Sequence, residues 1–203
     1  IMTALKDNGI ADNTLVIFTS DNGPTFNGGA DSHFFESAKP FRGLKMDLYE
    51  GGIRAPFIAY WQGTIVSGQS SDLISAQYDM MATFADLIGS KANDDTDGIS
   101  MAPTLLGKGN QQQHDYLLWE YPEKGGQQAV RMGKWKAIRT NIKNNSNAPI
   151  QLFDLSKDIN EDNDVSAYNP KIIARIKQVL ADRTPASVAK WEMSGFNLPP
   201  KSH

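Results

Sequence analysis

The spacing of apolar positions differs between the two halves of the chain, and the first half has the pattern of an α/β fold. Residues 15–18 form a short continuous apolar run, which is typical of a strand buried on both faces of a parallel sheet, and residues 57–61 form a second apolar run that predicts another strand. Apolar residues over 79–88 recur at helical spacing, and Gly89 follows as a stop signal. Residues 1–8 and 101–106 also have helical features. We therefore expect an α/β sheet domain over residues 1–110, in which strand 15–19 follows a helix and runs parallel to a strand further upstream.

The second half has short apolar segments separated by turn residues, which predicts an antiparallel sheet. The expected strands are 116–120, 129–131, 135–139 and 151–154. Apolar residues return to helical spacing over 170–181, and this helix should cover one face of the sheet. A polar stretch at 107–114 precedes these strands. We therefore expect a small α+β subdomain over residues 111–203.

A long irregular segment, residues 23–45, lies between the two apolar runs of the first half. Glycine and proline recur along it, and a loop of that length in a compact domain is usually functional or disordered. It leads to Gly51 and Gly52, which indicate either a tight turn or a close approach of two backbones.

Polar side chains follow the first strand directly. In open α/β sheets, ligands bind at the carboxyl ends of strands, which is where Asp21 and Asn22 lie. Both offer the oxygen donors that Mg²⁺ or Ca²⁺ requires. Taken alone, an Asp-Asn-Gly sequence is more often a turn than a metal site, because these are the usual turn residues.

Composition narrows the function classes. The net charge is −3 with both signs interspersed, and without a basic cluster we expect no nucleic acid partner. The apolar runs are far shorter than the ~20 residues of a membrane-spanning helix, so we expect no membrane insertion. The 203 residues include no cysteine, which excludes disulfides and a thiol nucleophile here. The chain begins inside a helical pattern, so we expect a fragment. No pattern indicates an oligomeric state.

Several motifs recur in an order that resembles one known family. The segment K-x-x-x-x-E-G-G-x-R-x-P follows the Asp-Asn-Gly sequence, and further motifs lie downstream, namely Asp79 with its helix, Asp97-Gly98, residues 130–136, and residues 152–155. This ordered set resembles the formylglycine-dependent sulfatases of the arylsulfatase type, within the alkaline-phosphatase-like superfamily. The resemblance covers nearly the whole chain. It implies the C-terminal part of the α/β sheet domain, followed by the small antiparallel subdomain with its helix.

The resemblance also implies roles for individual residues. Asp21 and Asn22 would ligate Ca²⁺ or Mg²⁺, and Lys45 would contact the sulfate. These roles agree with the chemistry, because a dication and an ammonium stabilise the charge that shifts during sulfate ester hydrolysis. His33 lies on the loop between them and is a candidate substrate contact. Arg42 is a weaker candidate of the same kind.

The family's nucleophile is a formylglycine made within a C/S-x-P-x-R motif, and this sequence has no such motif. We therefore expect the nucleophile and the remaining metal ligands in sequence that precedes this chain, and the chain alone to be inactive. The substrate of the parent protein would be a sulfated small molecule or a sulfated glycan. The resemblance also implies a periplasmic or secreted parent protein.

Simpler interpretations remain open for several residues and for the function. Lys45 and His33 could be ordinary surface residues, and His114 and His203 are expected at the surface. We expect Glu50 and Arg54, four residues apart, to form a structural ion pair. The alternative functions are hydrolysis of phosphate or phosphonate monoesters by the same superfamily fold, and a non-catalytic module that binds a carbohydrate or a protein partner.

Overall fold

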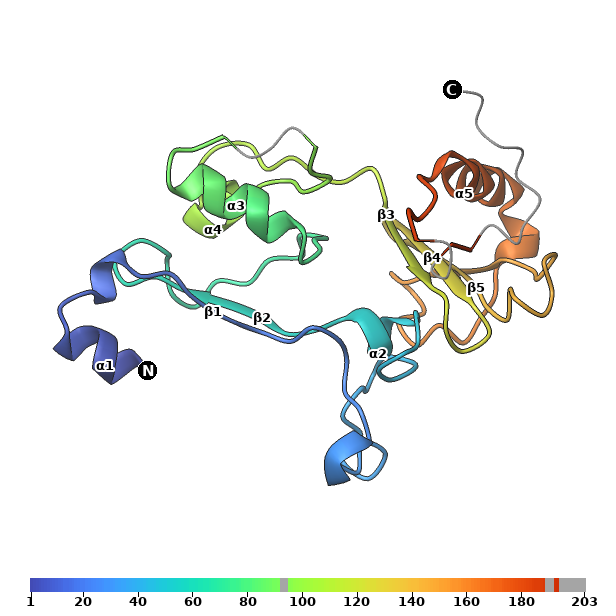
Figure 1. Cartoon of the computed structure of the whole chain (residues 1–203), viewed down its shortest axis with the longest axis horizontal. Coiled ribbons are helices and arrows are strands. Elements are labelled where there is room, and N and C mark those ends of the chain that lie inside the picture. Colours follow the sequence, from blue (N-terminus) through green and yellow to red (C-terminus); the bar gives the residue numbers. More distant parts are fainter. Residues whose placement is uncertain (92–94, 189–191, 194–203) are drawn as a thin grey trace. The chain divides into compact units, whose positions relative to one another are not determined.

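The computed structural model describes residues 1–91, 95–188 and 192–193, and its contacts divide the chain into two compact units (Figure 1). The N-terminal unit contains residues 1–21 and 55–115, and the sheet unit contains residues 22–54 and the chain from residue 116 onward. Residues 22–54 thus group with a sheet that lies much later in the sequence. The predicted domain boundary at residue 110 stays a prediction.

The N-terminal unit combines short helices with a two-stranded sheet. Its elements are α1 (Met2–Asp7), the 3₁₀ helix η1 (Ala11–Asn13), β1 (Val16–Thr19), β2 (Phe57–Tyr60), α3 (Asp79–Leu87) and α4 (Ala102–Leu106). Strand β1 pairs with β2 in antiparallel register, with Val16 opposite Tyr60. All of the predicted helices and strands in this part are confirmed to within about two residues. The parallel neighbour expected upstream of β1 stays a prediction.

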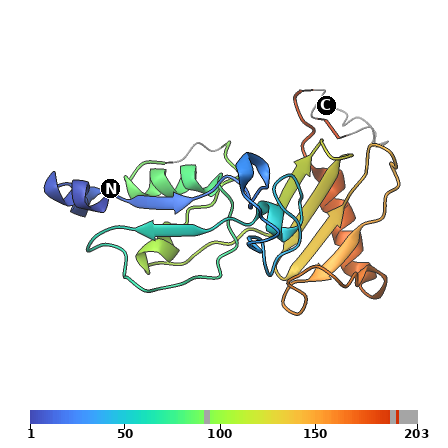
Figure 2. The ribbon, with the colours of Figure 1, turned by 90° about the horizontal axis from the view of Figure 1, so that it is seen from below.

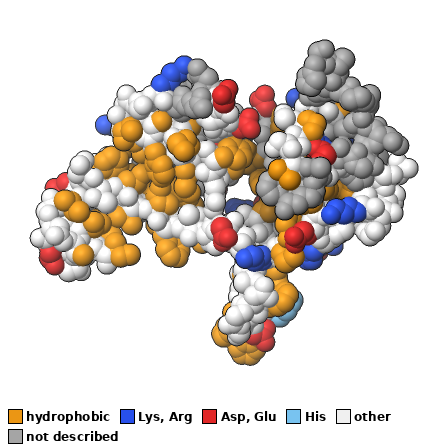
Figure 3. All heavy atoms as spheres, in the orientation of Figure 1, with side chains coloured by type: hydrophobic (Ala, Val, Ile, Leu, Met, Phe, Trp, Pro, Cys, Tyr) orange, Lys and Arg blue, Asp and Glu red, His pale blue; other side chains and the backbone are white. Residues whose placement is uncertain are grey.

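The expectation that β1 is buried on both faces is wrong for this chain. Phe18 is 64% exposed, and Ile58 on β2 is 60% exposed. A two-stranded sheet cannot cover both of its own faces, and burial requires further layers. Figure 3 accordingly shows hydrophobic side chains gathered over the surface of this unit.

No helix among the described residues is long and apolar enough to cross a membrane.

The sheet unit is built on a four-stranded antiparallel meander, which Figure 2 shows face on. The strands β3 (Leu117–Tyr121), β4 (Gln127–Met132), β5 (Trp135–Arg139) and β6 (Gln151–Asp154) pair in sequence order. The remaining elements are η2 (Asn27–Gly29), α2 (Glu50–Ile53), η3 (Ser166–Tyr168) and α5 (Pro170–Asp182). The predicted four strands and the final helix are therefore confirmed.

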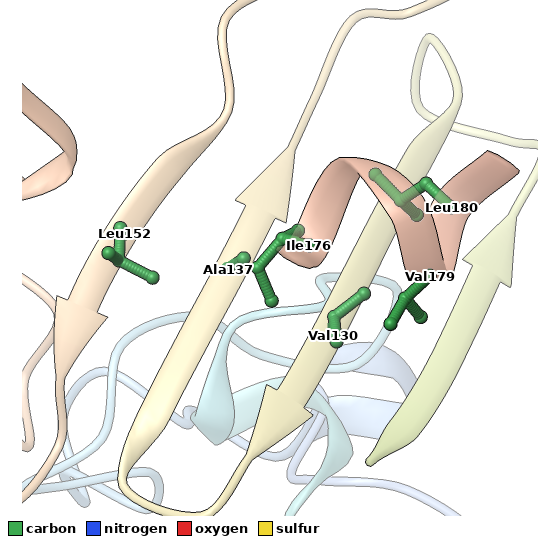
Figure 4. Packing of buried hydrophobic residues seen from close by; sticks show 6 residues of the cluster. All are labelled: Val130, Ala137, Leu152, Ile176, Val179 and Leu180. Atoms are coloured by element: carbon green, nitrogen blue, oxygen red, sulfur yellow. The ribbon is translucent and has the colours of Figure 1, made fainter. Parts of the chain in front are cut away.

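The sheet has an apolar core on each face, because successive side chains of a strand point to opposite sides. On one face, α5 packs against the sheet, as the prediction required (Figure 4); this core contains Val130, Ala137, Leu152, Ile176, Val179 and Leu180. On the other face, Leu48 from the early segment packs with Ile138 and Phe153. The second core therefore fixes the segment that carries Lys45 against the sheet.

Candidate functional site

Asp21 and Asn22 are adjacent oxygen donors just after β1, and each retains a free oxygen. The Asp21 side chain is exposed and has no hydrogen bond or ion pair among the described residues. Asn22 donates from Nδ2 to the Gly23 carbonyl at 2.8 Å, which leaves its carboxamide oxygen available. This chemistry fits a hard cation, but Ca²⁺ takes roughly six to eight oxygens. Within the described ranges no cluster of three or more acidic or histidine side chains could hold a metal ion, so these two residues fit as part of a larger ligand set.

The end of the Asp-Asn-Gly sequence touches the two-glycine segment. The Gly23 N–H donates to the Gly52 carbonyl at 2.9 Å. A Cβ atom on Gly23 would lie 1.8 Å from the Gly51 carbonyl oxygen, and one on Gly51 would lie 2.4 Å from the Gly43 carbonyl oxygen. Of the two possibilities that the sequence left open, the close approach of backbones is therefore confirmed. Glycine at these positions allows the two motifs to meet.

Lys45 lies beside this junction on an exposed turn. Its N–H donates to the Pro24 carbonyl at 2.8 Å, which ties the turn to the chain just after the Asp-Asn-Gly sequence. Its side chain is exposed and has no ion pair within the part of the chain that the structure describes. The ammonium group is therefore available for an anion.

Lys45 and His33 line the same pocket of about 410 Å³, so the structure brings these two predicted residues together. Two other lysines line it, but Lys39 pairs with Glu36 and Lys124 pairs with Asp47. Lys45 thus supplies uncompensated positive charge to the pocket. The wall also includes the aromatic rings of Phe26 and Phe41.

Arg42 has a structural role in this arrangement. Its guanidinium lies over the Tyr49 ring, 4.1 Å from the centroid, and Nη1 donates to the Glu161 carbonyl at 2.8 Å. Both contacts are within the sheet unit. The hydrogen bond uses one of the five N–H donors of the guanidinium and leaves the others available, so a substrate contact by Arg42 stays a prediction.

Glu50 is a buried ion-pair residue, but its principal partner is not the predicted one. Its Oε2 lies 3.8 Å from Nη1 of Arg54, which is 51% exposed, so the predicted pair is present but long. Its Oε1 accepts from Lys136 Nζ at 2.7 Å, and its Oε2 accepts from Arg131 Nη1 at 3.2 Å. Lys136 is fully buried. The closer partners, Arg131 on β4 and Lys136 on β5, lie 81 and 86 residues after Glu50 in the sequence.

Glu161 completes this buried cluster. Its Oε2 accepts from the Glu50 N–H at 2.7 Å, while its Oε1 lies 3.8 Å from Lys136 Nζ. Burial raises the pKa of Glu161 to about 7, and the charges of Lys136 and Arg42 offset this rise only in part. Neither Lys136 nor Glu161 was predicted from the sequence as a residue of this cluster. The sequence did contain one indication. Lys136 lies two residues before the buried Ile138 on the same strand, so both side chains point to the same face of the sheet.

The raised pKa of Glu161 predicts a specific dependence of stability on pH. The folded form keeps its proton up to about pH 7, whereas the unfolded form loses it near the ordinary value of 4.5. The protonated Glu161 side chain therefore contributes fully to the free energy of unfolding below about pH 4.5, and this contribution is lost as the pH rises through 7. Glu161→Gln, which cannot titrate, should remove this contribution, on the order of 1 to 3 kcal/mol, from the pH profile. Urea denaturation between pH 5 and 8 measures it. Parallel profiles for the two proteins would contradict the assignment.

The expectation that His114 is a surface residue is wrong. Its Nε2 lies 2.8 Å from Oδ1 of Asp79, and its side chain is only 10% exposed. Asp79 is buried and also accepts from the backbone N–H groups of Ala76 and Ile99. A buried carboxylate needs such partners, and His114 supplies one of them. His203 lies outside the described residues.

Comparison with known proteins identifies the family. The sulfatase family model matches residues 1–90. Human arylsulfatase A is 32% identical over 88% of this chain, and an N-acetylgalactosamine-6-O-sulfatase of Bacteroides thetaiotaomicron is 31% identical over 89%. The crystal structure of Ps i-CgsB in complex with k-i-k-neocarrahexaose superposes on this chain with a TM-score of 0.71 at 32% sequence identity. The superposed region covers 88% of this chain and 38% of the Ps i-CgsB chain.

The chain spans about two fifths of these relatives, 39% of the human protein and 38% of the bacterial one. The structural matches confirm the predicted fold class, the alkaline-phosphatase-like α/β fold with the antiparallel sheet and its helix. The order of motifs along the sequence agrees with this assignment. The chain therefore belongs to the sulfatase family and corresponds to the C-terminal portion of its fold.

Proposed function

We propose that the complete protein hydrolyses sulfate monoesters, either aryl or carbohydrate sulfates, and that Lys45 binds the sulfate group. The observation that carries this proposal is the exposed, unpaired ammonium of Lys45 in the 410 Å³ pocket. Its turn is joined to the Asp-Asn-Gly sequence through the Pro24 carbonyl. A sulfate oxygen gains charge stabilisation from such an ammonium, because the two carboxylates that line the pocket, Glu36 and Asp47, are paired with Lys39 and Lys124.

Sulfatases generally use a metal ion and a formylglycine. In this protein Asp21 and Asn22 would hold Ca²⁺ or Mg²⁺ together with ligands from the rest of the sequence. The ion would supply electrostatic stabilisation of the ester's oxygens. The formylglycine nucleophile would come from sequence that precedes this chain. Within this chain, the work of Lys45 is to orient the anion, and His33 on the same pocket wall would contact the organic part of the substrate.

The substrate class that fits this pocket is a sulfated small molecule or a sulfated glycan. Sulfate would face Lys45, while the aromatic walls formed by Phe26 and Phe41 offer apolar surface to a ring. One of the similar proteins is an N-acetylgalactosamine-6-O-sulfatase, and another, Ps i-CgsB, forms a crystal complex with k-i-k-neocarrahexaose. A periplasmic or secreted location would suit such a substrate, and fractionation of the source cells tests it.

The test of the function compares ester types on the complete protein. We expect hydrolysis of 4-nitrophenyl sulfate with added Ca²⁺ and much slower hydrolysis of 4-nitrophenyl phosphate. Faster hydrolysis of the phosphate or a phosphonate ester would assign the protein to the other chemistry of the superfamily. Absence of turnover with all three esters, combined with glycan binding, would favour a non-catalytic module.

The isolated chain should not hydrolyse 4-nitrophenyl sulfate, with or without Ca²⁺. Its sequence has no C/S-x-P-x-R motif and no cysteine, so it cannot supply the expected nucleophile. The measurement is release of 4-nitrophenol by purified chain 1–203, with the complete protein as the positive control. Clear turnover by the chain alone would show that its own residues include a nucleophile and that the assignment of roles is wrong.

A further inference from the structure

The turn that carries Lys45 has little regular structure of its own. Its backbone closes through the Asp47 N–H, which donates to the Leu44 carbonyl at 2.9 Å, and Asp47 Oδ2 accepts from the Leu44 N–H at 3.1 Å. Met46 has a positive φ of 79°, which is unusual for a residue other than glycine. Such a conformation is strained for a residue with a side chain and persists only where its surroundings hold it.

Gln127, the first residue of β4, supplies two of the contacts that hold this turn. Its Nε2 donates to the Met46 carbonyl at 2.9 Å, and its Oε1 accepts from the Leu48 N–H at 3.2 Å. The side chain is only 3% exposed, so its bonds are shielded from water. One buried carboxamide therefore spans the two peptide groups on either side of Asp47, two residues after Lys45. The backbone of Gln127 is itself held by the sheet, because it pairs with Tyr121 of β3.

A lysine side chain is long and flexible, so the place of its ammonium depends on the backbone beneath it. A displacement of about 1 Å at a catalytic site can cost on the order of 100-fold in rate. We propose that Gln127 is a positioning residue for the anion site and fixes Lys45 through the Met46 and Leu48 peptide groups. The sheet of the C-terminal portion is then a support of the sulfate site. This inference rests on the proposed function of Lys45.

The adjacent residue provides a matched control. Gln128 has the same side chain and is also buried, at 4% exposed, but it points to the opposite face of the sheet. Its Nε2 donates to Glu120 Oε1 at 2.6 Å, away from the Lys45 turn. Replacement of either glutamine by methionine keeps the volume and removes the hydrogen bonds. The two substitutions therefore differ in whether they touch this turn.

The test is a double-mutant cycle in the complete protein, with 4-nitrophenyl sulfate as the probe. Gln127→Met should lower kcat/KM about 10-fold or more, whereas Gln128→Met should change it less than 3-fold. In a Lys45→Ala background, Gln127→Met should have almost no further effect, because the residue acts through Lys45. Full additivity of the two substitutions would overturn the proposal, as would equal effects of Gln127→Met and Gln128→Met.

Amide hydrogen exchange gives a second readout that does not need activity. Gln127→Met should raise exchange in peptides that cover residues 44–48, and Gln128→Met should not. If the wild-type protein fails to hydrolyse the sulfate, the proposed function falls, and the exchange result still decides whether Gln127 holds the turn. Unchanged exchange would overturn the positioning role. Should Gln127→Met not fold, Gln127→Glu, which retains an acceptor for the Leu48 N–H, goes through the same cycle and exchange measurement.

Discussion

Lys45→Ala in the complete protein should lower the kcat/KM for 4-nitrophenyl sulfate by on the order of 100-fold or more. The ammonium of Lys45 has no carboxylate partner among the described residues, so its charge is available to the sulfate. Loss of one group that stabilises charge at the reacting centre typically costs 100- to 1,000-fold. Initial rates over a range of ester concentrations measure the effect.

Lys39→Ala is the matched control for this measurement. Lys39 lines the same pocket and is exposed, but its ammonium pairs with Glu36. We expect a change of less than 3-fold. Lys45→Arg should restore only part of the activity, because a planar guanidinium does not replace a compact ammonium. An effect of Lys45→Ala below 3-fold would return Lys45 to the ordinary surface lysines and remove the basis of the proposed sulfate contact.

The elements of this fold could be predicted because their signals are local. The helix α5 (Pro170–Asp182) follows the 3.6-residue spacing of its apolar side chains, and β5 (Trp135–Arg139) has clear turn residues on both sides. By contrast, α2 (Glu50–Ile53) contains two adjacent glycines, which disfavour a helix when judged by propensity. Tertiary contacts stabilise α2, because the N–H of its first residue, Glu50, donates to the carboxylate of Glu161, which lies 111 residues later.

The candidate site was predictable only in its motifs and not in its support. Asp21, Asn22 and Lys45 lie in short ordered motifs that a reader of the sequence can recognise. The contacts of Gln127 with the Lys45 turn join residues that are about 80 positions apart. No local periodicity specifies such a pair, since many polar residues along the later strands could have faced that turn. The exposure of apolar side chains on β1 and β2 has a related cause. Whether a strand is buried depends on the layers that pack against it, and the sequence of the strand itself does not specify them.

Lys136→Met should reduce the stability of the sheet unit more than any other single change discussed here. Lys136 is fully buried between Glu50 and Glu161, with Nζ at 2.7 Å from Glu50 Oε1. Its removal leaves a buried carboxylate without its closest counter-charge, for which losses of about 3 to 5 kcal/mol are typical. Arg131 and Arg54 remain near Glu50 and compensate in part. Urea denaturation, followed by tryptophan fluorescence, measures the loss.

Lys134→Met separates this effect from the loss of any lysine pair. Lys134 bonds to Asp154 at 2.6 Å, but its side chain is 48% exposed, so its removal should cost less than about 1 kcal/mol. Glu50→Gln combined with Lys136→Met should recover part of the lost stability, because it removes the uncompensated charge. If Lys136→Met and Lys134→Met were equally mild, the buried cluster would not be what holds α2 on the sheet. The apolar contacts of Leu48, just before α2, would then have to provide that attachment.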